Sequence, residues 1–138
     1  MDPVALDQLI NAALAAQRRA YAPYSRFAVG AAAMVADGHI FSGANIENAS
    51  YPLTICAERV ALFCAHMAAA GPVTALAIVT PTPTVASPCG ACRQVIFELA
   101  PRAQIILLNA DGSERRFTTP AELLPYGFGP DQLEAQGR

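Results

Sequence analysis

The chain has 138 residues, 54% of them hydrophobic, which is enough apolar material for one core, so residues 1–138 are expected to form a single domain. The formal net charge is −2, and the basic residues are arginines scattered along the chain, which argues against nucleic acid as a partner. No apolar run is long enough for a bilayer and no secretion signal is evident, so we expect no membrane partner and a cytoplasmic location.

The first predicted elements are a helix and a hairpin. Asp2 as N-cap and Pro3 at the first helical position begin a helix that is expected to end near Ala20. Two strands, at residues 27–36 and 40–44, follow. The Asp-Gly pair between them is typical of a tight turn.

Two more helices are predicted further along. Thr54 is expected to cap a helix that runs to about Ala70 and is apolar on nearly every side, as suits burial against a sheet or another subunit. Ser87, with Pro88 after it, is expected to begin a helix that ends near Leu99. The remaining elements are strands at 75–80, 104–109 and 115–118 and a short helix at 120–124. This order predicts an α/β fold, a three-layer α/β/α sandwich with a central mixed five-stranded sheet.

Three of the four cysteines lie at the predicted helix starts. With Thr54 and Ser87 as caps, Cys56 and Cys89 take the second position of their helices, and Cys92 lies one turn after Cys89. Free N–H groups and the positive end of the helix dipole favour thiolate over thiol there. Two such helix ends facing each other predict a site for a soft metal such as zinc.

A fourth protein ligand is not evident. Cys64 lies eight residues after Cys56, roughly 12 Å along a helix, which is too far to share one zinc. His66 lies further along the same helix. His39 falls in the hairpin turn, and the sequence neither excludes nor favours it as the fourth ligand. Three thiolates and one water are the ligands we expect, as in a catalytic site. Cys64, His39 and His66 are assigned no role.

The spacing of two of these cysteines and one nearby glutamate bear on the kind of chemistry. The Cys89-x-x-Cys92 spacing alone fits a redox pair or half of a structural zinc knuckle. Glu58, two residues after Cys56, adds a carboxyl group that is not needed as a ligand. A metal-bound water and one such proton shuttle in a dry pocket can hydrolyse an aromatic amine.

Three thiolates leave a zinc centre with a formal charge of −1, which opposes ionisation of its water. We hypothesise that Arg59, and with it Arg93, donates hydrogen bonds to the cysteine sulfurs and offsets that charge. A surface ion pair is the alternative for Arg59.

These residues together resemble the small cytidine deaminases, over about residues 20–133. The resemblance implies hydrolytic deamination of cytidine and 2′-deoxycytidine to uridine and 2′-deoxyuridine in pyrimidine salvage, with one zinc per subunit, zinc-bound hydroxide attacking C4, and Glu58 as proton shuttle. The motifs that carry it are Cys56-Ala57-Glu58-Arg59, Pro88-Cys89-Gly90-Ala91-Cys92-Arg93-Gln94, Ala22-Pro23-Tyr24-Ser25, Gly43-Ala44-Asn45-Ile46-Glu47-Asn48-Ala49-Ser50-Tyr51 and Leu123-Leu124-Pro125.

The resemblance also implies the contacts with the substrate. Asn45 and Glu47 would hold the ribose 3′-hydroxyl, Phe27 would pack against the pyrimidine, and the backbone around Ala57 would read the base edge. A carboxylate at Glu47 suits a free nucleoside, because it would repel a phosphate attached to the same hydroxyl.

Members of this family with a cysteine as first ligand are homotetramers with pockets shared between subunits. The resemblance implies that Tyr51 and Phe128 reach a neighbouring subunit's pocket. The sequence departs from the family pattern at Pro52, in place of a common Gly, and at Ala28, in place of a common Pro, which puts the local loop shape in doubt but touches no ligand.

Two alternative functions stay open. The first is a deaminase of another aminated nucleoside analogue, against which Asn45 and Glu47 argue because they fit a ribose. The second is a non-enzymatic module in which zinc is structural, against which Glu58 beside an incomplete ligand set argues. Deoxycytidylate would need a cationic pocket for its phosphate, and the sequence marks none.

Overall fold

The computed structural model describes residues 1–134. Its strands are β1 (Gly30–Val35), β2 (Ile40–Ala44), β3 (Val73–Val79), β4 (Gln104–Leu108) and β5 (Arg115–Thr118). They form one five-stranded sheet in the order β2-β1-β3-β4-β5. Strands β3 and β4 pair in parallel, and the other neighbouring pairs are antiparallel. The predicted mixed five-stranded sheet is therefore confirmed.

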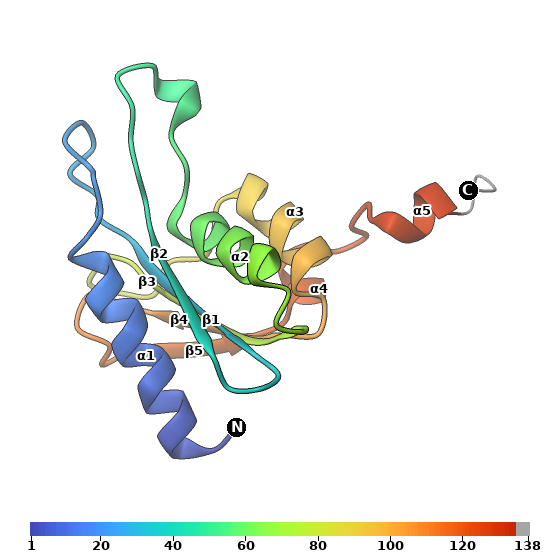
Figure 1. Ribbon diagram of the computed structural model, residues 1–138. Coiled ribbons are helices and arrows are strands. Elements are labelled where there is room, and N and C mark those ends of the chain that lie inside the picture. Colours follow the sequence, from blue (N-terminus) through green and yellow to red (C-terminus); the bar gives the residue numbers. More distant parts are fainter. Residues whose placement is uncertain (135–138) are drawn as a thin grey trace.

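Helices cover both faces of this sheet (Figure 1). The described helices are α1 (Pro3–Gln17), α2 (Ala57–Ala68), α3 (Gly90–Leu99), α4 (Pro120–Leu123) and α5 (Pro130–Glu134), with a 3-10 turn η1 (Tyr51–Leu53). Helix α1 packs on one face, and α2 and α3 pack on the other. This arrangement confirms the three-layer α/β/α sandwich. Within residues 1–134, none of the helices is long and apolar enough to cross a lipid bilayer.

The central strands are apolar on both faces because helices cover both. Along β1, Ala31 and Ala33 belong to the core beneath α2 and α3, whereas Ala32 and Met34 belong to the core beneath α1. Strand β4 alternates between the two cores in the same way. A continuous apolar run is typical of strands buried on both sides, and each such residue contributes roughly 25 cal/mol per Å² of buried apolar surface.

The first helix and the hairpin form where the sequence predicts them, with shorter ends. The Asp2 carboxylate accepts a hydrogen bond from the Ala5 N–H at 3.4 Å and caps α1. The helix ends at Gln17 and not near Ala20. The hairpin turns at Gly38, whose φ of 94° lies in the left-handed region that glycine adopts without strain.

Strand β1 begins at Gly30 and not at Phe27, because a side chain occupies the preceding backbone groups. The Asn45 side chain accepts a hydrogen bond from the Val29 N–H at 2.8 Å and donates one to the Phe27 carbonyl at 2.7 Å. These bonds take the place of strand pairing. They also hold Phe27 close to Asn45.

The caps of α2 and α3 are cysteines, so the prediction that Thr54 and Ser87 cap them is wrong. Cys56 is the N-cap of α2 and Cys89 is the N-cap of α3. The Cys89 Sγ accepts a hydrogen bond from the Cys92 N–H at 3.4 Å, so a sulfur replaces the usual capping oxygen. Both helices therefore begin later than predicted, while the equivalence of the two cysteines holds.

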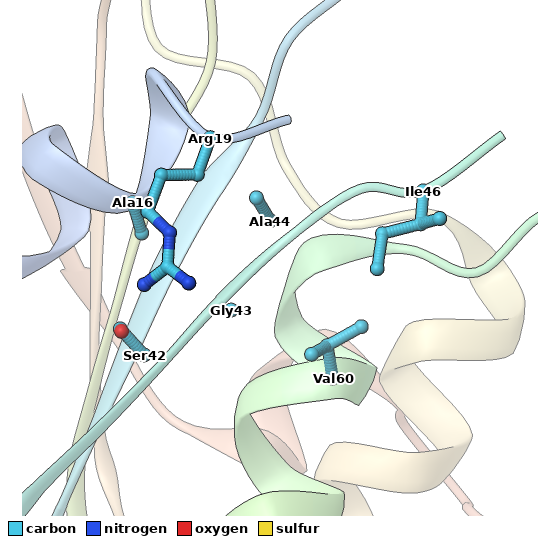
Figure 2. Close-up of a pocket in the computed structure, with 7 residues that line it drawn as sticks. All are labelled: Ala16, Arg19, Ser42, Gly43, Ala44, Ile46 and Val60. Carbon is cyan, nitrogen blue, oxygen red and sulfur yellow. The ribbon is translucent and has the colours of Figure 1, made fainter. Parts of the chain in front are cut away.

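A glycine brings β2 close to the start of α2. A Cβ added at Gly43 would come within 2.5 Å of the Ala57 carbonyl oxygen and the Ala61 nitrogen, so any larger residue would push the strand from the helix. Figure 2 shows this crossing, with Gly43 between the end of α1 and helix α2. The close approach places residues 45–47, which follow β2, beside the first turn of α2.

Candidate active site

The starts of α2 and α3 bring three cysteine sulfurs together. The Sγ atoms of Cys56 and Cys89 are 3.9 Å apart, and those of Cys89 and Cys92 are 3.3 Å apart. All three lie within 4.8 Å of one another. Cys64 is exposed on α2 and lies outside this cluster. The three cysteines that the sequence groups are thus the three that the fold brings together.

Protons and charge are shared unequally among these sulfurs. The hydrogen bond from Cys92 and the Arg59 guanidinium, which donates to the Cys56 Sγ at 3.1 Å, together lower the pKa of the Cys56 thiol to about 5. The same bond between the two cysteines, together with burial, raises the pKa of Cys92. One thiolate is therefore stabilised by its neighbours' protons, which a cation bound to all three sulfurs would displace.

The donor set fits zinc. Zn–S bonds of about 2.3 Å in tetrahedral geometry place two sulfurs roughly 3.8 Å apart, which the cluster already approaches. Thiolates are ligands that zinc prefers, and three of them leave one position for a small molecule. The cluster therefore has the ligands and spacing of a catalytic zinc site.

Glu58 lies in the first turn of α2, two residues after Cys56, and is only 5% exposed. Burial, followed by the negative charge of Cys56, raises the pKa of its carboxyl group. A carboxyl group with a raised pKa accepts a proton more readily than an ordinary carboxylate and can return it in a later step. Glu58 therefore has the environment of a proton shuttle beside the sulfurs.

A cavity of about 480 Å³ opens next to the cluster and contains most of the predicted site residues. Its volume suits a small organic molecule. Five separate sequence segments contribute to its wall. The lining residues are Ser25, Phe27, Val29, Asn45, Glu47, Thr54, Cys56, Ala57, Glu58, Ile78, Thr80, Ala86, Ser87, Pro88 and Cys89.

Glu47 carries the second carboxylate of this cavity and is held in place by three donors. Its Oε1 accepts hydrogen bonds from the N–H groups of Tyr24 and Ser25, at 2.9 and 3.1 Å, and its Oε2 accepts one from the Ser25 hydroxyl. These hydrogen bonds, that of the Ser25 hydroxyl above all, lower the pKa of the Glu47 carboxyl group. Glu47 is therefore a fixed, ionised acceptor with lone pairs left for a ligand hydroxyl.

Tyr51 and Phe128 lie outside the cavity within one chain. Tyr51 is 69% exposed and borders a neighbouring hollow with Tyr24, whose ring centroid is 5.7 Å away. Phe128 is 57% exposed on the segment between α4 and α5. Both side chains are free to contact another molecule.

Several pocket residues were not singled out from the sequence. Ser25 belongs to a motif that carries the resemblance, yet no role was assigned to it. Ile78 and Thr80 lie at the end of β3, where the sequence resembles any buried strand. The available signal was their position at the carboxyl end of a strand beside a parallel neighbour, where ligand sites often form.

The hypothesis that Arg93 donates to the sulfurs is wrong. Its guanidinium donates to the Pro88 carbonyl at 2.8 Å, to the Ser87 hydroxyl at 2.6 Å and to the Leu123 carbonyl at 2.8 Å. Arg93 is in the first turn of α3, and these three acceptors draw its side chain toward the preceding loop. The hypothesis holds for Arg59, whose Nη2 bonds to Cys56.

Comparison with known proteins is consistent with this geometry. The family model described as the cytidine and deoxycytidylate deaminase zinc-binding region matches residues 4–108. Cytidine deaminase from Halalkalibacterium halodurans is 48% identical over 126 residues, which cover 91% of this chain and 95% of that protein. Cytidine deaminase from Mycobacterium tuberculosis is 42% identical over 138 residues, which cover 100% of both. The crystal structure of cytidine deaminase from Burkholderia pseudomallei matches with a TM-score of 0.85 at 47% identity, covering 93% of this chain and 100% of that one.

Proposed function

This chain belongs to the zinc-binding cytidine and deoxycytidylate deaminase family, and from that membership we propose that it deaminates cytidine and 2′-deoxycytidine hydrolytically. The products are uridine or 2′-deoxyuridine and ammonia. The observation that carries the proposal is a buried carboxyl group, Glu58, in the same cavity as an incomplete set of three cysteine ligands. A purely structural zinc site would have four protein ligands and no use for that carboxyl group.

Cys56, Cys89 and Cys92 would hold one zinc per chain. Zinc bound there supplies the Lewis acidity that makes a water molecule nucleophilic at neutral pH. The two helix N-termini and the Arg59 guanidinium offset the negative charge of three thiolates.

Glu58 moves the protons of the reaction. Its carboxylate takes a proton from the attacking water and delivers it to the ring nitrogen next to C4. It then passes the second proton to the amino group, which leaves as ammonia when the C4–N bond breaks. Burial of Glu58 suits both directions of transfer, because it raises the pKa of the carboxyl group and so makes its carboxylate a stronger proton acceptor than an exposed one.

The far wall of the cavity would bind the nucleoside. The Glu47 carboxylate and the Asn45 side chain would take the ribose 3′-hydroxyl, the Phe27 ring would pack on the pyrimidine, and the backbone at Ala57 would read the base edge. Phe27 and Asn45 are linked by a hydrogen bond of 2.7 Å, and Glu47 follows Asn45 by two residues. Two hydrogen-bonded segments, one before β1 and one after β2, therefore present the ring contact and the ribose contacts next to each other.

Ser25→Ala is expected to raise the KM for cytidine about tenfold, with kcat changed less than about twofold. The Ser25 hydroxyl donates to the Glu47 carboxylate and accepts a hydrogen bond from the Phe27 N–H at 3.0 Å, so its loss loosens two substrate contacts that exist before the reaction starts. Steady-state kinetics measure both constants. The control is Ser42→Ala, an exposed serine in the small hollow of Figure 2. A lower kcat at unchanged KM would contradict this role.

Arg59→Gln is expected to lower kcat/KM about 10- to 100-fold while most of the zinc stays bound. The substitution removes the donor 3.1 Å from the Cys56 sulfur and the positive charge beside the thiolates, but no ligand. Kinetics and zinc analysis on the same sample measure the two effects. The matched control is Arg19→Gln, an exposed arginine that Figure 2 shows in the hollow between α1 and β2. Wild-type kinetics in Arg59→Gln would count against the charge argument.

We also propose that the chain forms a homotetramer in which Tyr51 and Phe128 reach a neighbouring subunit's pocket. The exposure of both side chains supports this, as does the exposure of Phe63 (43%) and Met67 (82%) on α2, because apolar side chains of this size are usually covered. Light scattering should give about four chain masses. A fully active monomer would contradict the proposal.

Two further expectations belong to this proposal. Residues 1–138 would form one catalytic domain, of which residues 135–138 lie outside the described part of the chain. A cytoplasmic location is supported by the metal site itself, because three cysteine ligands must stay reduced to bind zinc.

The reaction is tested by ultraviolet absorbance of cytidine mixed with zinc-loaded protein, with and without a chelator. Loss of the cytidine band, release of ammonia and inhibition by the chelator are the expected results. A flat trace from folded, zinc-containing protein would contradict cytidine deamination. Deoxycytidine and other aminated nucleosides would then be tried, and a flat trace with all of them would favour a structural zinc module.

A further inference from the structure

We propose that Arg93 is a positioning residue that fixes the loop before Cys89 against the C-terminal segment, and that it thereby sets how tightly zinc is held. The loop consists of residues 87–89, and the C-terminal segment of residues 119–129. Arg93 acts through backbone geometry and not through charge on the sulfurs. The kinetic part of this proposal rests on the proposed deaminase function, whereas the part on zinc does not.

The three acceptors of the Arg93 guanidinium lie on two separate segments. Its Nε and Nη2 donate to the Pro88 carbonyl and the Ser87 hydroxyl, at 2.8 and 2.6 Å, and its Nη1 donates to the Leu123 carbonyl at 2.8 Å. A planar guanidinium offers several donors in a fixed fork, so it sets the positions of these acceptors relative to one another. One side chain therefore fixes the loop and the C-terminal segment at the same time.

The loop that Arg93 fixes connects directly to the zinc site. Ser87 and Pro88 line the substrate cavity, and Cys89, the next residue, contributes one of the three sulfurs. Pro88 is buried, and its carbonyl needs a donor because an unpaired buried carbonyl costs about 1–3 kcal/mol. A shift of this loop would therefore move both the cavity wall and a ligand.

The C-terminal segment needs the same bond. Leu123 is the last residue of α4, where helix carbonyls have no partner inside the helix. The cationic Arg93 side chain supplies a donor there, and a positive charge near a helix C-terminus is favourable. The bond to Leu123 thus holds the C-terminal end of α4 next to the first turn of α3.

A second and independent contact joins the same elements. The Gln94 side-chain amide donates to the Phe128 carbonyl at 2.7 Å. Two consecutive residues of α3, one turn after the capping cysteine, therefore hold the C-terminal segment at two points. This pairing indicates that the attachment of the segment to the metal-binding helix is built into α3.

The test compares Arg93→Gln and Arg93→Lys with the wild type. The control is Arg102→Gln, an exposed arginine in the loop between α3 and β4. The rate of zinc release to a chelating dye is measured first. Amide hydrogen exchange of residues 119–129 is measured on the same zinc-loaded proteins.

Arg93→Gln is expected to release zinc about 10- to 100-fold faster, the range found when outer partners of metal ligands are removed. Exchange of residues 119–129 should rise in the same variant, and KM for cytidine should rise more than kcat falls. Arg93→Lys keeps the charge but not the fork, so it should also release zinc faster than the wild type, though less so than Arg93→Gln. Gln94→Ala should raise exchange near Phe128 and leave zinc release unchanged.

Wild-type zinc release in Arg93→Lys and Arg93→Gln would overturn the proposal, as would faster release without any change in exchange. If Arg93→Gln does not fold, Arg93→Lys decides. Both measurements are made without substrate, so they test the role of Arg93 even where the wild type proves inactive on cytidine, which would contradict the proposed function alone.

Discussion

Glu58→Gln is expected to lower kcat about 10²- to 10⁴-fold while one zinc and the nucleoside stay bound. The substitution keeps the size and burial of the side chain but removes the group that accepts and returns protons. Zinc analysis, equilibrium binding of the nucleoside product and steady-state kinetics on one preparation separate these effects. Glu98→Gln, which changes an exposed glutamate on α3, is the matched control.

Two carboxyl groups line the cavity, and their environments assign them different tasks. Burial raises the pKa of Glu58, whereas the Ser25 hydroxyl and two backbone N–H groups lower the pKa of Glu47. Environments that separate two pKa values in this way distinguish a proton carrier from a permanently ionised group. Glu47→Gln should therefore raise KM more than it lowers kcat.

The two glutamine variants therefore show which of the two carboxyl groups carries the proton. If Glu47 carried the proton, its glutamine variant would show the large loss in kcat and Glu58→Gln would mainly change KM. Near-normal turnover in Glu58→Gln would reject the proposed mechanism.

Much of the fold could be predicted from the sequence, because local patterns determine it. The Asp2 cap, the turn at Gly38 and the run Arg115–Thr118 are local signals, and the structure contains all three. The helix α5 (Pro130–Glu134) was not predicted, because a single short turn has no apolar period to detect. The starts of α2 and α3 were each predicted too early because their N-cap residues are cysteines, which propensity rules do not include among helix caps.

The candidate site also has a part that local patterns predict and a part that they do not. Cys56 with Glu58, and Cys89 with Cys92, could be grouped from spacing, because a helix start fixes residues that are two or three positions apart. The shared thiolate chemistry of the two helix starts then predicted that they face each other. The contacts of Ser25 with Glu47 and of Arg93 with Leu123 join residues 22 and 30 positions apart. Such contacts depend on how the elements pack, which no local pattern in one sequence specifies. Arg59 and Arg93 follow their cysteines in similar ways, yet only Arg59 reaches a sulfur.

Single substitutions of Cys56, Cys89 and Cys92 by alanine are each expected to remove most of the zinc and, with it, nearly all activity. Each variant leaves two thiolates, which hold zinc far more weakly than three in this spacing. Quantitative zinc analysis should fall from one metal per chain toward zero. Cys64→Ala is the matched control, because Cys64 is exposed on α2 outside the cluster, and it should keep one zinc and full activity.

Thermal unfolding separates loss of the metal from damage to the fold. Zinc that binds only the folded chain stabilises it, by about 4 kcal/mol at a free concentration a thousand times the Kd. A chelator should therefore lower the Tm of the wild type and of Cys64→Ala, and leave the Tm of the three ligand variants unchanged because they have no zinc to lose. Cys92 is fully buried, so Cys92→Ala should have the lowest Tm of the three. Zinc lost from Cys64→Ala, or kept by Cys89→Ala, would show that the ligands are assigned wrongly.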